Sequence, residues 1–230
     1  SALEEFGDYK LVNQTKIRTK GAINLYESWA SIPHVTHFDE ADITLLEQQR
    51  ADLNKISAQK ITPLSFVVKA VSLALEEYPI FNSSLVGKGK IMQRNYINLG
   101  IAVNTNEGLI VPVIKDANDL NIGQIALEIK ALSDKAKNKK LFTKDLSGGT
   151  FTISSLGGIG GTGFTPIINP PEVGIMGLSK TKTQLSLVED KIVEKTLLPF
   201  SVSYDHRVIN GVDAGNFVNF IKETLEKGIT

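Results

Sequence analysis

The most regular hydrophobic pattern in the chain lies between Thr62 and Pro79. Six apolar residues are spaced there so that they share one side of a helix: Phe66, Val67, Ala70, Val71, Ala74 and Leu75. Thr62 suits the N-cap and Pro63 suits the first helical position, while Pro79 ends the pattern. The segment is therefore predicted to be a helix with one broad apolar side.

Other stretches repeat this periodicity or alternate as strands do. Helices are predicted over residues 13–26, 44–56, 121–137 and 212–225. Strands are predicted over residues 34–43, 81–86, 97–103, 109–114, 148–155, 173–178, 184–188 and 192–204. Pro112 implies that its strand lies at an edge or contains a bulge. Because helices and strands alternate irregularly and no repeat is found, residues 1–230 are predicted to form one α+β domain, with a large mixed sheet and helices largely on one face.

Composition and charge remove several classes of function. The 230 residues include 25 basic and 25 acidic side chains, so there is no basic excess of the kind that nucleic-acid surfaces need. The basic run at residues 135–144 is interpreted as a solvated helix end. No apolar run approaches the roughly 20 residues that span a bilayer, and the first residues lack the pattern of a signal peptide. Neither a nucleic-acid nor a membrane partner is expected.

Metal and thiolate chemistry are also not expected. The chain has no cysteine, which excludes thiolate catalysis and cysteine-based metal sites. His34 and His37 lie three apart in an alternating segment, so they should point to opposite faces and serve structural roles. The acidic residues that follow them lack the spacing of a calcium loop. We therefore predict no metal site.

His206 is the best placed of the three histidines for catalysis. It lies between a predicted strand and a predicted helix, and Asn210 and Gly211 follow it. A histidine at such a junction is held firmly and can face a cleft, as a general base must. On its own the position is still more common for a structural histidine.

A second group of polar residues ends the strand at 148–155. Ser154 and Ser155 precede a glycine-rich segment, residues 157–163, which matches G-x-G-x-x-G but is not followed by a helical pattern. A dinucleotide site is therefore disfavoured. The serines do not lie in the G-x-S-x-G pattern of hydrolases, and no acidic third member of a triad can be assigned. A histidine base with a serine oxyanion donor, and a nucleophile that the substrate supplies, fits these residues better.

Several motifs in the same order resemble one family. They are residues 29–37 (Trp-Ala-Ser-Ile-Pro-His-Val-Thr-His), 60–63, 81–84, 98–103, 108–113, 151–158 (Phe-Thr-Ile-Ser-Ser-Leu-Gly-Gly), 166–173 (Pro-Ile-Ile-Asn-Pro-Pro-Glu-Val) and 205–211 (Asp-His-Arg-Val-Ile-Asn-Gly). Together they are similar to the catalytic domain of the 2-oxoacid dehydrogenase acyltransferases, and within it to the acetyltransferase branch that serves the pyruvate dehydrogenase complex. The resemblance runs from about Phe6 to Glu226. It implies the coenzyme A-dependent acyltransferase fold of chloramphenicol acetyltransferase.

The resemblance also implies an activity and roles for three residues. The reaction would transfer an acetyl group between dihydrolipoamide and coenzyme A, with no metal. By motif position His206 would remove the proton from the attacking thiol, and Ser154, with Ser155 as the less favoured alternative, would donate a hydrogen bond to the oxyanion. Asn210 stands where many members have aspartate, and its implied role is hydrogen bonding that fixes the local geometry. The site would lie between the subunits of a homotrimer, so that a lone monomer is inactive.

Partners and alternatives follow from the same resemblance. The lipoyl group would be carried on a separate upstream domain, and the pyruvate dehydrogenase and dihydrolipoamide dehydrogenase components would be partners. Trimers of the family can assemble into a larger cage, and a few apolar residues at the end of family members help in this. This sequence ends at Gly228-Ile229-Thr230, with fewer such residues. The location would be the cytoplasm of a bacterium or the mitochondrial matrix of a eukaryote.

Three alternatives stay open, and the residues that bind coenzyme A cannot be named. Succinyl or branched-chain acyl transfer belongs to the same chemistry. A free-standing antibiotic acetyltransferase fits the motif set less well. A catalytically silent scaffold would not need both His206 and Ser154.

Overall fold

A mixed β-sheet lies at the centre of the computed structural model, which describes residues 6–229; residues 1–5 and 230, the two ends of the predicted domain, lie outside it. The sheet has the order β1-β11-β9-β8-β4-β7, and β10 pairs with β11. The strands are β1 His34–Asp42, β2 Ser83–Leu85, β3 Ile91–Gln93, β4 Leu99–Ile101, β5 Val103–Thr105, β6 Gly108–Ile110, β7 Val113–Ile114, β8 Phe151–Ser155, β9 Gly174–Leu178, β10 Lys182–Val188 and β11 Lys191–Asp205. β8 runs parallel to β4 and β9, whereas the other pairs are antiparallel.

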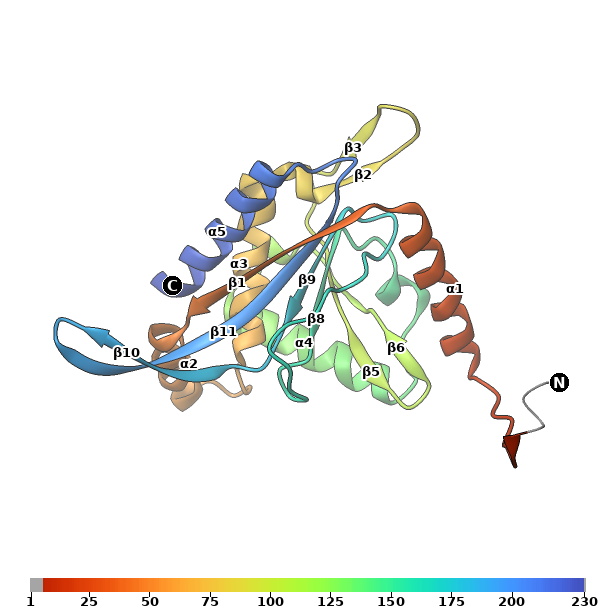
Figure 1. Ribbon diagram of the computed structural model, residues 1–230. Coiled ribbons are helices and arrows are strands. Elements are labelled where there is room, and N and C mark those ends of the chain that lie inside the picture. Colours follow the sequence, from red (N-terminus) through yellow and green to blue (C-terminus); the bar gives the residue numbers. More distant parts are fainter. Residues whose placement is uncertain (1–5, 230) are drawn as a thin grey trace.

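Most helices cover one face of this sheet (Figure 1). The helices are α1 Lys16–Ser31, α2 Thr44–Ile56, α3 Pro63–Glu77, α4 Ile122–Lys137 and α5 Gly211–Lys227, with short 3-10 turns at Pro79–Asn82, Ala117–Asp119 and Thr143–Leu146. The core forms where α3 and α5 pack behind β1, β8, β9 and β11; the Phe81 and Phe217 rings stack there with centroids 3.8 Å apart. α1 lies apart from these helices, beside β6 (Figure 1). The α+β prediction, with helices largely on one face, is confirmed.

The opposite face of the sheet carries small and hydroxyl side chains. Successive strand residues point to opposite faces, so Thr152 and Ser154 of β8 point away from the core residues Phe151 and Ile153. On β11 the Ser201 hydroxyl donates to the Phe164 carbonyl at 2.7 Å. These small residues let the segment between β8 and β9, residues 156–173, lie across this face.

Two predicted strands are each broken in the structure. The segment 97–103 contributes β4 to the main sheet and then begins β5, because the Ala102 amide bonds to Ile153 and the chain then pairs with β6 in a separate ribbon. The segment 109–114 divides between β6 and β7 at Pro112, which has no amide hydrogen to continue a ladder. β7 is the edge strand of the main sheet, so the edge position inferred from Pro112 is correct.

Several other boundaries differ from the prediction, and one predicted cap lacks its hydrogen bond. Strand β2 begins only at Ser83, because the residues after Pro79 form a 3-10 turn. The first helix begins at Lys16, where the Thr15 hydroxyl accepts from the Arg18 amide, and continues to Ser31. Thr62 is the N-cap of α3 by position, but its side chain makes no capping hydrogen bond.

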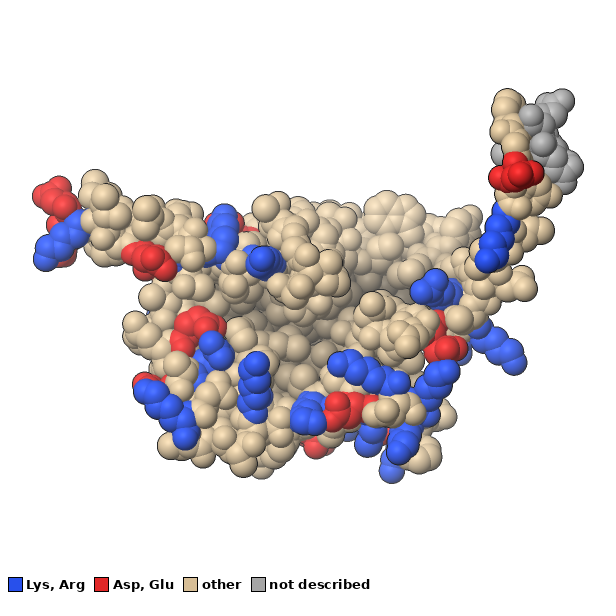
Figure 2. Space-filling view, turned by 90° about the horizontal axis from the view of Figure 1, so that it is seen from below, with Lys and Arg blue, Asp and Glu red and all other residues tan. Residues whose placement is uncertain are grey.

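Two segments project from the body (Figures 1 and 2). One is the N-terminal arm, residues 6–15, with Phe6, Leu11 and Val12 strongly exposed. The other is the β10–β11 hairpin, in which Leu187 pairs with Ile192 and both side chains are exposed. None of the helices in residues 6–229 has the length and apolar character to cross a membrane.

Candidate active site

The turn after β11 presents the His206 side chain. The amides of Val208 and Ile209 both donate to the Asp205 carbonyl at 3.0 Å, and the His206 amide donates to the Pro33 carbonyl at 3.1 Å. The buried Asp205 carboxylate binds the Arg207 guanidinium at 2.7 Å, and these hydrogen bonds raise the pKa of Arg207. Backbone and side-chain contacts therefore fix the turn on both sides of His206, whose own side chain is exposed.

Asn210 closes the same turn and starts α5. Its Oδ1 atom accepts from the amides of Val212 at 2.9 Å and Asp213 at 3.0 Å, which makes Asn210 the N-cap of the helix. The turn that carries His206 is thereby tied to α5, and α5 is anchored in the core by Phe217 and Ile221. Asn210 supports the histidine from the helix side.

Ser154 lies on the floor of a cavity of about 540 Å³. Thr152 shares the floor, and the walls come from α1, β6 and the loop at residues 164–170. From α1 they include Ile17, Lys20, Gly21, Asn24 and Leu25. Ser155 is exposed and does not line the cavity. Of the two serines that the sequence left open, Ser154 is the one that faces an enclosed space.

Ser154 and His206 of one chain do not meet. In the sheet register Ser154 is level with Gly177 of β9, and Gly177 is level with Ser201 of β11. His206 lies five residues beyond Ser201, towards the opposite end of the sheet. With a rise of about 3.3 Å per residue and about 4.8 Å between strands, the Cα atoms of Ser154 and His206 are roughly 19 Å apart. A hydrogen bond cannot bridge that distance.

Glu172 is a chemically distinctive residue near Ser154 that the sequence pattern did not single out. Its carboxyl group is buried, and burial raises its pKa from 4.5 to about 8. Thr152, on the cavity floor, donates to its Oε2 atom at 2.6 Å. The signal in the sequence was a lone acidic residue between Pro171 and the apolar strand that begins at Gly174.

The remaining histidines and glycines do not form a second site. The Ile168 amide donates to His34 Nε2 at 3.0 Å, and a ring with its proton on Nδ1 donates to the Ile32 carbonyl at 2.8 Å, so His34 holds the loop in place. His37 lies against the ring of Tyr204 with centroids 6.4 Å apart. The chain after the glycine-rich segment 157–163 is irregular until β9, without the helix that a dinucleotide site requires.

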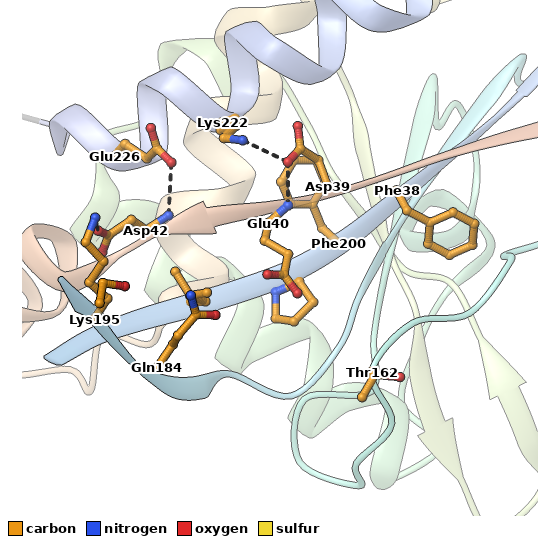
Figure 3. A pocket seen from close by; sticks show the side chains of 13 residues that line it. Phe38, Asp39, Glu40, Asp42, Thr162, Gln184, Lys195, Phe200, Lys222 and Glu226 are labelled. Atoms are coloured by element: carbon orange, nitrogen blue, oxygen red, sulfur yellow. Dashed lines mark hydrogen bonds and ion pairs between the residues drawn. The ribbon is translucent and has the colours of Figure 1, made fainter.

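A separate hollow of about 470 Å³ beside β1 contains neither Ser154 nor His206 (Figure 3). Its carboxylates are already engaged by neighbouring amines: Asp39 by Lys222 at 2.8 Å and Asp42 by Lys195 at 3.0 Å. Glu226 accepts from the Asp42 amide at 3.1 Å. Within residues 6–229 no group of three or more His, Asp or Glu side chains is arranged to hold a metal ion.

The basic run at residues 135–144 is partly neutralised by acidic neighbours. Lys135 pairs with Asp145 at 3.6 Å and Lys139 with Glu107 at 2.9 Å. In the view from below, Lys and Arg side chains gather over the lower part of the surface, several of them beside acidic ones (Figure 2). The run ends α4 and continues into the following loop, as the sequence pattern indicated.

Comparison with known proteins identifies the class to which this fold and these residues belong. The catalytic domain of the 2-oxoacid dehydrogenase acyltransferases matches residues 6–230, and the chain belongs to this family. It is 49% identical over 209 residues to the dihydrolipoyllysine-residue acetyltransferase component of the pyruvate dehydrogenase complex of Buchnera aphidicola (subsp. Acyrthosiphon pisum), covering 88% of this chain and 53% of the relative. The component from Pseudomonas aeruginosa is 46% identical over 226 residues, covering 96% and 41%. The chain thus spans about half the length of such relatives, or less.

Solved structures agree with this assignment. The dihydrolipoamide acetyltransferase of Azotobacter vinelandii, studied for the role of a serine, a histidine and an asparagine in its catalytic mechanism, superposes with a TM-score of 0.95 at 41% identity, covering 98% of this chain and 95% of that one. The cubic core of a pyruvate dehydrogenase multienzyme complex gives the same values. Chloramphenicol acetyltransferase has a TM-score of 0.59 at 13% identity, covering 87% and 92%, which shows the shared fold alone. The predicted fold class is confirmed.

Proposed function

We propose that this chain is a catalytic core that transfers an acetyl group between dihydrolipoamide and coenzyme A. The main support for this proposal is the spacing of Ser154, His206 and Asn210 along the sequence. Ser154 precedes His206 by 52 positions and Asn210 follows it by four, and the serine, histidine and asparagine studied in the Azotobacter acetyltransferase have the same separations. In this chain Ser154 lines a cavity, and Asn210 caps the helix that follows the His206 turn.

The chemistry needs one base and one oxyanion donor. The imidazole of His206 removes the proton from the thiol of coenzyme A, and the thiolate attacks the carbonyl carbon of the acetyl-dihydrolipoyl thioester. The Ser154 hydroxyl donates a hydrogen bond to the resulting oxyanion. The tetrahedral intermediate then expels the dihydrolipoyl thiolate, which takes the proton back from the imidazolium. Because both the entering and the leaving groups are thiols, one base serves both directions.

The roughly 19 Å between Ser154 and His206 in one chain means that this mechanism needs a second copy. A homotrimer in which each copy offers Ser154 to one neighbour and His206 to the other supplies three complete sites. Asn210 acts in it as a positioning residue. Through its bonds to α5 it holds the His206 turn at the orientation that the partner's cavity requires.

Helix α1 offers the surface on which a second copy would pack. Of its residues only Ser28 is buried. Ile23, Tyr26 and Trp29 are 54%, 74% and 62% exposed. At 3.6 residues per turn they lie with Ala22 and Ala30 on the side opposite the residues that line the cavity. The three large side chains offer on the order of 400 Å² of apolar surface, about half of what one partner buries in a standard interface.

The larger assembly follows from the relatives. We propose that residues 1–230 are one acyltransferase domain of a longer protein, since the chain spans only part of its relatives, and that the lipoyl group is carried on an upstream domain. The trimer would be built into a cage, as in the cubic core of a pyruvate dehydrogenase complex. Pyruvate dehydrogenase and dihydrolipoamide dehydrogenase components are the proposed partners. Because the relatives named above are bacterial, a cytoplasmic location is proposed.

Acyl specificity provides the direct test. The chain is incubated with coenzyme A and acetyl-, succinyl- or isobutyryl-dihydrolipoamide, and the acyl-coenzyme A that forms is measured by chromatography. Acetyl transfer should be the fastest. A preference for succinyl or isobutyryl groups would assign the chain to another branch of the family. An assembled protein that turns over none of the three would be a silent scaffold.

A further inference from the structure

The wall of the Ser154 cavity is held from behind by buried polar groups. Asn169 and Pro170 line both this cavity and a smaller hollow of about 180 Å³, into which Glu172 and Arg94 face. The stretch from Asn169 to Glu172 therefore separates the acyl-transfer cavity from a polar space behind it. Whatever fixes this stretch also fixes the position of the cavity wall.

Glu172 is the centre of these contacts. The residue is 4% exposed, and its Oε2 atom accepts from Thr152 Oγ1 at 2.6 Å. Its Oε1 atom accepts from Asn169 Nδ2 at 3.4 Å, and its own amide donates to the Asn169 carbonyl at 3.1 Å. A Cβ atom on Gly149 would lie 3.0 Å from Oε1, so Gly149 leaves room for the carboxyl group. One side chain thus joins the wall to the floor of the cavity.

Arg94 holds the other end of the same stretch. Its Nη2 atom donates to the Ser84 hydroxyl at 2.6 Å, and that hydroxyl donates to the Pro171 carbonyl. Its Nη1 atom is buried and has no hydrogen-bond partner. The positive charge of Arg94 is still near enough to Glu172 to lower the pKa of that carboxyl group.

Within residues 6–229, Arg94 is the one charged side chain that shifts the pKa of this carboxyl group by its charge. Thr152 of β8 and Asn169 of the loop are neutral, and Tyr96 lines the hollow. Lys115 lies beside Gly148, where its amine donates to the Ser147 carbonyl. Burial outweighs the Thr152 and Asn169 hydrogen bonds and the charge of Arg94, all of which lower the pKa of Glu172. The pKa therefore rises to about 8, and the carboxyl group is mostly protonated at pH 7.

Neutrality matters because of where Ser154 lies. Thr152 and Ser154 are two residues apart on one face of β8, which puts the Glu172 carboxyl about 8–10 Å from an oxyanion at Ser154. At that distance an ionised Glu172 would oppose the oxyanion by roughly tenfold in rate. A protonated carboxyl can keep its hydrogen bond with Thr152, whose hydroxyl can donate or accept, without that repulsion.

We propose that Glu172 is a positioning residue of the acyl-transfer site: its buried carboxyl group ties the cavity wall to Thr152 and lies close enough to an oxyanion at Ser154 for its ionisation to slow the reaction. The inference rests on the proposed acetyl transfer. It adds a residue that touches neither substrate and acts through Thr152 and Asn169.

The test compares the wild type with Glu172→Gln across pH 6–9.5, with Glu223→Gln, an exposed glutamate on α5, as the matched control. Steady-state acetyl transfer gives kcat and KM for each protein. Both proteins act on the same substrate thiol, so the effect of its ionisation on kcat cancels in the ratio of wild type to Glu172→Gln. This ratio should fall by roughly tenfold as the pH rises through 8, whereas the ratio for Glu223→Gln stays flat. A flat ratio for Glu172→Gln would overturn the proposal.

Two readouts that need no turnover separate this inference from the proposed function. The infrared difference spectrum between wild type and Glu172→Gln should contain the band of a protonated carboxyl at pH 7 and lose it above pH 8. Amide hydrogen exchange in residues 164–172 should be faster in the wild type than in Glu172→Gln at pH 9, and equal at pH 6. Absence of the band at pH 7, or equal exchange at both pH values, refutes the role of Glu172. Absence of acetyl transfer in a wild type that shows both signals refutes the proposed reaction instead.

Discussion

Two inactive variants should restore acetyl transfer when their subunits are mixed. Ser154→Ala removes the oxyanion donor and leaves His206 intact, whereas His206→Ala removes the base and leaves Ser154 intact. In a single chain the two residues are roughly 19 Å apart, about six times the length of a hydrogen bond. A complete site must therefore take Ser154 from one variant and His206 from the other.

Symmetry sets the size of the effect. In a ring of three identical contacts each site takes its serine from one subunit and its histidine from the next. If equal amounts of the two variants assemble at random, about one quarter of all sites receive both intact residues, and each mixed trimer has one complete site of three. The parents should be far weaker, since loss of an oxyanion donor alone costs on the order of 10²–10³ in rate. The mixture should therefore exceed either parent by at least tenfold.

The assay uses co-expressed variants that carry different affinity tags, with hybrids isolated on both tags in sequence and counted by native mass spectrometry. As a control, a chain that carries both substitutions is assembled with wild type in equal amounts. A shared site leaves about one quarter of the sites complete, whereas a site within one chain leaves about one half. Hybrids that are present but no more active than the parents would refute the shared site.

Four further outcomes are expected. Ser154→Ala should lower kcat by roughly 10²–10³ and Ser155→Ala by much less, because of these two serines only Ser154 lines the cavity. Steady-state kinetics of both variants test this, and a larger loss in Ser155→Ala would contradict it. Asn210→Ala should lower the free energy of unfolding by about 1 kcal/mol in urea, because it removes the cap of α5; an unchanged midpoint would show that the cap does not matter. Tyr26→Asp should weaken assembly by at least about tenfold, because a carboxylate would enter an apolar contact, and sedimentation equilibrium should detect smaller species. Glu172 has a pKa of about 8 in the folded chain and 4.5 as its ordinary value, so between these pH values the unfolded chain binds fewer protons than the folded chain. The free energy of unfolding of the wild type should therefore fall by up to about 1.4 kcal/mol per pH unit from pH 5 to 8. That of Glu172→Gln should not show this fall.

Hydrophobic periodicity predicted the elements of this fold better than their ends. The long helix at α3 and the strand at β11 follow directly from their patterns. The segments at 97–103 and 109–114 looked like single strands, because an apolar run does not show where a chain leaves one sheet for another. Pro112 marked one of those breaks. The other depends on the hydrogen bond from Ala102 to Ile153, 51 residues away, which a local pattern does not contain.

The candidate site was predictable in its parts but not in its arrangement. His206 and Ser154 each end a strand, and their residue types suggested a base and an oxyanion donor. The distance between them depends on which strands are neighbours and in what register they pair. The alternation of hydrophobic and polar residues along a strand specifies neither. Glu172 escaped notice because its chemistry comes from burial, and burial of a loop residue is a property of the fold.

Helix α1 forms one wall of the Ser154 cavity, yet within one chain it buries a single residue, Ser28. The Ser28 hydroxyl donates to the Ile168 carbonyl at 2.6 Å. A newly made, solitary subunit would thus lack a firm cavity wall as well as a histidine beside its serine. If the proposed mechanism holds, such a chain would not catalyse attack on an acyl thioester before it binds its neighbours. On the proposed mechanism, assembly of the oligomer would complete both the cavity wall and the serine–histidine pair.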